Sequence, residues 1–114
     1  MKNLCCYLLP TFLFLIAGCD SSYEETVIAT PQPPELEILN DTDKPVFYFV
    51  IETEDSYLID LADPCENFQP NLHPKSTIAI PYDQISGMDK NADSVWFMWT
   101  DCQGESEFMT IKLY

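Results

Sequence analysis

Beyond residue 34 the apolar residues of this chain fall into short runs separated by turn-forming residues, and this pattern predicts strands. Residues 46–51 (VFYFVI) and 95–100 (VWFMWT) are apolar almost throughout and rich in β-branched and aromatic side chains. Such runs are typical of strands that are covered on both faces. Shorter or alternating runs predict further strands at 35–39, 57–61, 77–80 and 108–114.

Helical spacing of apolar residues is missing from every stretch of ten residues, and only 82–86, before Gly87, has the composition of a single helical turn. About six short antiparallel strands fit a sandwich or a small barrel. We expect an all-β fold, a single small antiparallel β-sandwich of the immunoglobulin-like type over residues 35–114.

Residues 1–18 have the layout of a secretory signal peptide that is cleaved off. One early charge, Lys2, is followed by an apolar run over residues 4–16, which only Pro10 and Thr11 interrupt, and then by small residues. A membrane-spanning helix needs about 20 apolar residues, so this run is too short to be one.

The segment Ile16-Ala17-Gly18-Cys19 resembles the lipobox of bacterial lipoproteins. The resemblance implies cleavage before Cys19 by signal peptidase II, diacylglycerol on its sulfur, and stable membrane anchoring by acyl chains. We therefore expect a bacterial cell-envelope protein that faces the periplasm or the exterior and has no cofactor besides the covalent lipid. Asp20 resembles an inner-membrane retention signal and Glu24-Glu25 resembles a surface-export signal, and a tether without a sorting role is the third possibility.

Residues 19–34 continue from the anchor as a polar, acidic segment that ends in Pro31, Pro33 and Pro34. This composition predicts an extended tether that holds the domain away from the membrane.

The charge excludes one class of partner. The 114 residues carry 19 Asp and Glu against five Lys and Arg, a net charge of −14. Nucleic-acid binding requires a basic surface to neutralise phosphates, so we expect no nucleic-acid partner. The length allows one domain.

Two of the five cysteines are available as a pair within the domain. Cys5 and Cys6 belong to the signal peptide and Cys19 to the lipobox, which leaves Cys65 and Cys102. An oxidising compartment and a domain too small for a large core both favour a disulfide between them.

Metal chemistry has little support in the sequence. A blue copper site needs two histidines and a cysteine, and the chain has only His73. A copper(I) site formed by Met88, Met98 or Met109 is the weaker interpretation, because methionines beside Trp in a strand are usually core residues. The alternation Asp89-x-Asn91-x-Asp93 resembles half of a calcium loop, but Ser94 and Thr100 replace the required Gly and Glu, so a turn explains it better.

Catalytic chemistry is equally unsupported. A serine nucleophile would have to be Ser76 or Ser86 with His73 as base, and neither serine lies in a nucleophile elbow. We therefore expect no catalytic residue, no metal and no enzyme.

Aromatic residues are the remaining candidates for a binding site. Trp96 and Trp99 fall on opposite faces of one predicted strand, as Phe47 and Tyr48 do on another. Either residues 61–75 cover the outward face, or Trp96, Trp99 and Tyr48 contribute to an exposed binding patch.

With the lipobox in front, the segments 44–48 (KPVFY), 80–87 (IPYDQISG) and 95–99 (VWFMW) resemble small bacterial lipoproteins with one compact β domain. The resemblance implies a non-catalytic interaction or accessory domain, bound to the membrane through its lipid and to an envelope protein. Lysozyme-inhibitor lipoproteins are similar in size, anchor and disulfide use, although this chain lacks their aromatic-x-Cys strand. An inhibitor of a basic envelope hydrolase is therefore the alternative, and a module binding sugar or calcium is a third.

Overall fold

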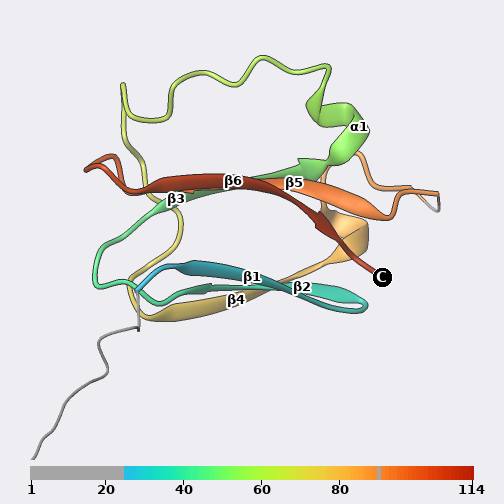
Figure 1. Ribbon diagram of the computed structural model, residues 1–114, viewed down its shortest axis with the longest axis horizontal. Coiled ribbons are helices and arrows are strands. Elements are labelled where there is room, and N and C mark those ends of the chain that lie inside the picture. The colour runs from blue at the N-terminus through green and yellow to red at the C-terminus, as the bar shows by residue number, and fades with distance from the viewer. Residues whose placement is uncertain (1–24, 90) are drawn as a thin grey trace, which may run out of the picture.

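The computed structural model describes residues 25–89 and 91–114, and these form a β-sandwich of two three-stranded antiparallel sheets (Figure 1). The predicted all-β class and the small antiparallel β-sandwich are therefore confirmed. The strands are β1 (Val27–Gln32), β2 (Glu35–Asn40), β3 (Phe47–Glu52), β4 (Ser76–Pro81), β5 (Ser94–Thr100) and β6 (Ser106–Lys112). The expected signal peptide, Cys19 and the segment up to residue 24 lie outside the described residues. No helix among the described residues is long and apolar enough to span a membrane.

The first sheet has the order β1-β2-β4. β1 pairs with β2 from Val27 opposite Asn40 to Gln32 opposite Glu35. The expectation of a tether reaching residue 34 is therefore wrong for residues 27–32. Strand patterns do not predict β1 because Pro31 interrupts it, but an edge strand accepts proline where the missing N–H faces away from its neighbour.

The second sheet has the order β3-β5-β6, and its inward face packs on the first sheet. Alternation along β5 buries Val95, Phe97 and Trp99, each at most 2% exposed. Leu36 and Ile38 of β2 are fully buried opposite them. The two runs predicted as covered strands are thus β3 and β5, the strands that carry the centre of the core.

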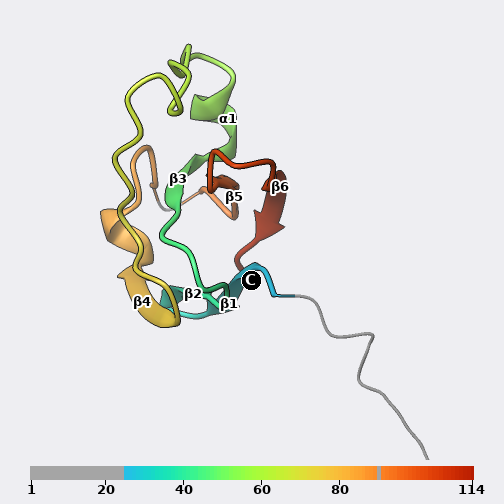
Figure 2. The same ribbon diagram turned by 90° about the vertical axis from the view of Figure 1, so that its left-hand side faces the viewer.

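A long connection over residues 57–71 arches across the outward face of the second sheet (Figures 1 and 2). It follows a single helical turn, α1 (Thr53–Ser56). The expectation of a strand at 57–61 is wrong. Glu52 accepts hydrogen bonds from the N–H groups of Glu54 and Asp55 and so starts the turn, after which Tyr57 and Leu58 donate back into it. Among the described residues, no strand lies beside residues 57–61 to form a β-ladder with them. We call residues 57–71 the arch.

The predicted single turn after β4 is present as the 3-10 helix η2 (Tyr82–Gln84). The Tyr82 hydroxyl donates to the carbonyl oxygen of Leu113 at 2.9 Å. After η2 the Glu52 N–H donates to the Ser86 carbonyl oxygen at 2.9 Å. This segment therefore closes one side of the sandwich, between β4 and β3.

Candidate functional site

The outward face of the second sheet carries a cluster of large apolar side chains. Register places Phe49 of β3 opposite Met98 of β5, and Met98 opposite Phe108 of β6, in one row across the sheet. Trp96 contacts the rings of Phe49 and Phe108 edge to face, with centroids 6.4 and 6.2 Å apart. We call Phe49, Trp96, Met98 and Phe108 the outer aromatic cluster.

A groove of about 530 Å³ lies over the β5–β6 side of this cluster. Its walls are formed by Trp96, Met98, Ser106, Glu107, Phe108 and Met109. Phe108 is 67% exposed, so the cluster is open to solvent on this side. The groove has the size and the mainly apolar walls of a site that accepts a ligand or partner side chains.

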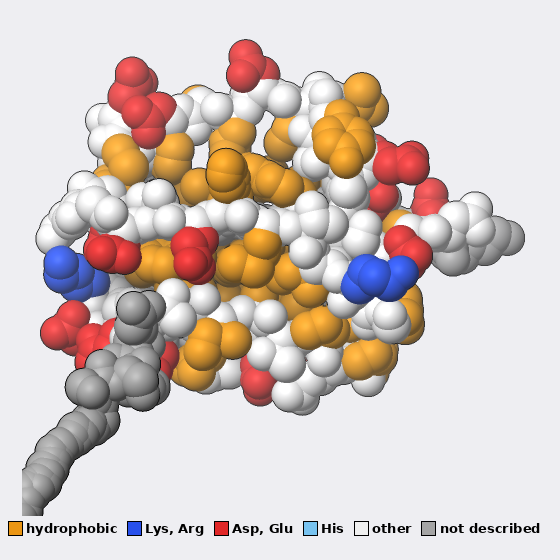
Figure 3. Space-filling view, in the orientation of Figure 1, with side chains coloured by type: hydrophobic (Ala, Val, Ile, Leu, Met, Phe, Trp, Pro, Cys, Tyr) orange, Lys and Arg blue, Asp and Glu red, His pale blue; other side chains and the backbone are white. Residues whose placement is uncertain are grey.

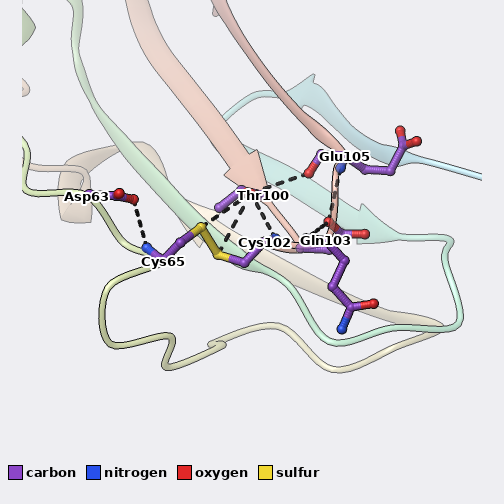
Figure 4. The surroundings of a disulfide bond; sticks show 7 residues. Asp63, Cys65, Thr100, Cys102, Gln103 and Glu105 are labelled. Carbon is purple, nitrogen blue, oxygen red and sulfur yellow. Dashed lines mark hydrogen bonds between the residues drawn. A yellow bond between two sulfur atoms is a disulfide. The ribbon is translucent and has the colours of Figure 1, made fainter.

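The arch covers part of the outward face, and a disulfide fixes its position. Cys65 in the arch is joined to Cys102 in the turn between β5 and β6, with Cα atoms 5.5 Å apart (Figure 4). The predicted pairing is confirmed. Thr100 Oγ1 accepts a hydrogen bond from the Cys102 N–H at 3.0 Å, and Asp63 accepts one from the Cys65 N–H at 2.9 Å. The disulfide therefore anchors the arch at the β5–β6 turn. This turn leads into Ser106 and Glu107, the first residues of β6, which line the groove.

The turn between β5 and β6 is ordered by a buried carboxylate. Asp101 is 5% exposed, and its Oδ1 accepts from the N–H groups of Gln103 and Glu105 at 2.7 and 3.1 Å. The Asp101 N–H in turn donates to the Glu105 carbonyl oxygen at 3.0 Å. These bonds set the position at which β6 begins.

The three residues considered as an exposed patch are not brought together. Trp99 is 2% exposed on the inward face, and Tyr48 lies opposite it there and stacks on Phe97 at 6.5 Å. Burial raises the pKa of the Tyr48 hydroxyl. Of these three residues, only Trp96 lies on the outward face, because the side chains of a strand alternate between its two faces.

Sequence reasoning missed Phe49 and Phe108 as members of the outer aromatic cluster. Phe49 and Phe108 occupy the same face as Trp96, but this is known only once the pairing of β3, β5 and β6 is known. The arch lies over part of the outward face, and the large apolar side chain that stays exposed there is Phe108, which neither alternative named.

The calcium-like segment is a turn before β5. Asp89 accepts a hydrogen bond from the Asn91 N–H at 2.8 Å, and Asp93 forms an exposed ion pair with Lys112 at 3.8 Å. Over residues 25–89 and 91–114, no three His, Cys, Asp or Glu side chains are grouped as metal ligands would be. The hydroxyl of Ser76 donates a hydrogen bond to the backbone carbonyl oxygen of His73 at 2.6 Å.

Of the three lysines in the described part of the chain, Lys75 and Lys112 lie close to carboxylates, whereas Lys44 is exposed and forms no ion pair with a described residue. Lys75 lies within 3.6 Å of Glu25 and 3.4 Å of Asp41, and Lys112 pairs with Asp93. Glu107 is the charged residue in the wall of the groove, and Glu105 is exposed just before β6. Figure 3 shows acidic side chains spread over the same view in which apolar side chains are visible between the sheets and below the arch.

No protein-family model, curated protein or solved structure matches this chain. The function therefore has to be argued from its own residues.

Proposed function

We propose that this chain is a bacterial lipoprotein, anchored through Cys19, whose β-sandwich is a non-catalytic interaction domain that binds a protein partner in the cell envelope. The lipobox-like segment 16–19 supports the anchor. The acidic surface and the outer aromatic cluster support the binding role.

The observation that carries the proposal is the exposure of Phe108 in the outer aromatic cluster. Its ring is 67% exposed although it packs on Trp96 at 6.2 Å in the wall of a groove of about 530 Å³. An apolar surface with aromatic side chains, rimmed by polar residues, is typical of a protein interface. The partner would cover Phe108 and the wall formed by Trp96 and Met98.

We also infer that the sandwich is immunoglobulin-like. Its orders β1-β2-β4 and β3-β5-β6 correspond to strands A-B-E and C-F-G of the constant-type domain, with the arch in place of strand D. The disulfide differs, since it joins the arch to a turn and not the two sheets.

A second candidate is an inhibitor of a basic envelope hydrolase. The net charge of −14 favours it, because attraction between opposite charges accelerates the association of an acidic protein with a basic one. This attraction weakens as the salt concentration rises. An inhibitor would use the same outer aromatic cluster, but its partner would be an enzyme whose turnover falls on binding.

The proposal is tested with the full chain in intact cells. A photo-crosslinking amino acid replaces Phe108, and the matched control places it at Thr77, an exposed residue of β4 on the other sheet. We expect a defined protein adduct from position 108 and none from 77. Equal labelling from both positions, or none from either, contradicts the interaction role.

Cys19→Ala tests the anchor in the same cells. We expect the variant to lose metabolic labelling by an alkynyl fatty acid and to leave the membrane fraction, because the acyl chains supply the membrane affinity. A Cys19→Ala chain that keeps both properties contradicts the anchor and leaves the interaction role standing. Turnover of the captured partner, measured with and without the chain, separates an accessory domain from an inhibitor.

A further inference from the structure

The four edges of the two sheets differ in how they are protected from pairing with another chain. Exposed strand edges present unpaired N–H and C=O groups, and proteins usually block them. The edge of β3 is occupied: Val46 exchanges backbone hydrogen bonds with Leu72, and Tyr48 exchanges them with the Asn71 side chain. Glu52 donates to Ser86 farther along the same edge.

The two edges of the first sheet are interrupted by proline. The Asp41 N–H donates to the carbonyl oxygen of Thr26, and the Tyr82 N–H donates to that of Pro34. Antiparallel pairs alternate between hydrogen-bonded and non-hydrogen-bonded, so these bonds fix which backbone groups face outward. By this alternation Pro31 of β1 and Pro81 of β4 stand at outward-facing positions, where they supply no N–H.

Among residues 25–89 and 91–114, the edge of β6 has neither kind of protection. The ladder between β5 and β6 is bracketed by hydrogen bonds from Asp101 N–H to Glu105 and from Leu113 N–H to Asp93. Because hydrogen-bonded and non-hydrogen-bonded pairs alternate between these two bonds, every second residue of β6 directs its backbone N–H and C=O groups away from β5. These residues are Ser106, Phe108, Thr110 and Lys112. Within the described part of the chain, no residue hydrogen-bonds to these outward groups.

We propose that β6 accepts an extended, basic segment of a protein partner as an added strand beside the groove. Strand addition uses backbone hydrogen bonds for affinity and pockets for alternate side chains for specificity. Here one set of side chains of the added strand lies beside Phe108 and enters the groove. The inference rests on the proposed function, whose partner it describes chemically.

Charge selects a basic segment over a second copy of this chain. Glu105 and Glu107 are exposed at the start of β6. Glu105 lines a hollow at this end together with Glu25, Asp43 and Asp101, so its four carboxylates outnumber Lys44, which also lines it, and Lys75, which lies near Glu25. The Lys112 ammonium at the far end of β6 is paired with Asp93. Two copies would bring net charges of −14 together along this edge, whereas Lys or Arg residues would find carboxylates there.

The probe is a peptide of about eight residues that alternates Lys and Val, and the control peptide alternates Glu and Val. Each is added to the full chain as purified from cells. We expect the Lys-Val peptide to slow the amide hydrogen exchange of Phe108 and Thr110 by roughly tenfold, because these N–H groups become donors to the added strand. Raising salt from about 50 to about 500 mM should weaken the binding.

Two edge variants locate the site. Thr110→Pro removes an outward N–H from β6, and Thr77→Pro removes one from β4, whose edge already contains Pro81. Both threonines are exposed, so the two substitutions are matched. We expect Thr110→Pro to lower the affinity for the peptide about tenfold and Thr77→Pro to leave it unchanged.

Glu105→Lys, compared with Glu35→Lys on the other sheet, gives a second measurement that leaves the backbone ladder intact. Glu105→Lys should weaken the Lys-Val peptide severalfold and Glu35→Lys should not. Equal binding of both peptides, equal loss in the matched variants, or unchanged exchange of Phe108 and Thr110 overturns the inference. Concentration-dependent protection of these amides without peptide also overturns it and assigns β6 to a second copy. If the adduct at position 108 persists when the peptide fails, the interaction role stands and the basic strand does not.

Discussion

Cys65 and Cys102 are joined across 37 residues of sequence, and their disulfide ties the middle of the arch to the turn that leads into β6. At the start of the arch Tyr57 and Leu58 are 77% and 83% exposed, and at its end Asn71 hydrogen-bonds to Tyr48, so the disulfide is what holds its middle in place. The disulfide therefore affects both the stability of the domain and the shape of the outward face.

Replacing both cysteines by serine should lower the free energy of unfolding by about 4 kcal/mol, from the entropy of a loop of this length in the unfolded chain. Urea unfolding of the oxidised wild type and the double variant measures the difference. Reduction of the wild type should produce the same loss. A stable reduced domain would show that the arch is held by its own contacts.

Asn40 is the second point that connects distant segments, and it is fully buried. Its amide nitrogen donates to the carbonyl oxygens of Lys44, Leu72 and His73, and its oxygen accepts from the N–H and hydroxyl of Thr42. Asn40→Leu should cost about 3 kcal/mol or more, because several buried polar groups lose their partners. The exposed Asn91→Leu is the control, and an equal loss there would contradict this role of Asn40.

Tyr82 should make the stability depend on alkaline pH. Burial, and secondarily the charge of Tyr114, raises the pKa of the Tyr82 hydroxyl above its ordinary value near 10. The raised pKa therefore contributes stability to the fold that is fully present below pH 10, the ordinary pKa of the unfolded chain. This contribution is lost as the pH rises through the pKa of the folded state. Tyr82→Phe should cost about 1 kcal/mol at neutral pH through the lost bond to Leu113, and its alkaline decline should be shallower. Tyr57→Phe, at an exposed position, should leave the profile unchanged.

Gly87 and Gly104 both have positive φ angles, 84° and 110°, but differ in their surroundings. A Cβ at Gly87 would collide with the Asp55 carboxylate and lie 3.1 Å from the Cβ of Glu52, whereas a Cβ at Gly104 would meet nothing within 4 Å. Both alanine variants carry backbone strain of about 1 kcal/mol. Gly87→Ala should therefore lose clearly more stability than Gly104→Ala in thermal unfolding, and equal losses would show that Asp55 moves aside freely.

The two tryptophans should respond differently to the neutral quencher acrylamide. Trp99 is 2% exposed in the core, whereas Trp96 lines the groove. Trp99→Phe, which leaves only Trp96, should be quenched readily, and Trp96→Phe should be protected. Trp99→Phe should also cost about 1 to 3 kcal/mol through the space it leaves in the core. Equal quenching of the two variants would contradict the assignment of faces.

The apolar runs at 46–51 and 95–100 predicted β3 and β5 correctly because a strand covered on both faces is apolar at nearly every position. β1 was missed because Pro31 and its polar neighbours carry no strand pattern, and its pairing comes from β2. At residues 57–61 a strand was predicted from apolar side chains but is not formed, because no strand of the described part of the chain lies beside them.

By itself the sequence determined the all-β class and the two central strands, because local composition is sufficient for these, and it predicted the pairing of Cys65 with Cys102 that the structure contains. Only the tertiary structure decided that Trp99 lies inside while Trp96 joins Phe49 and Phe108 outside. It also decided that β6 has no partner strand on its outer edge within the described part of the chain. Which faces and edges meet depends on pairing between segments far apart in the chain, and local patterns carry no information about those partners.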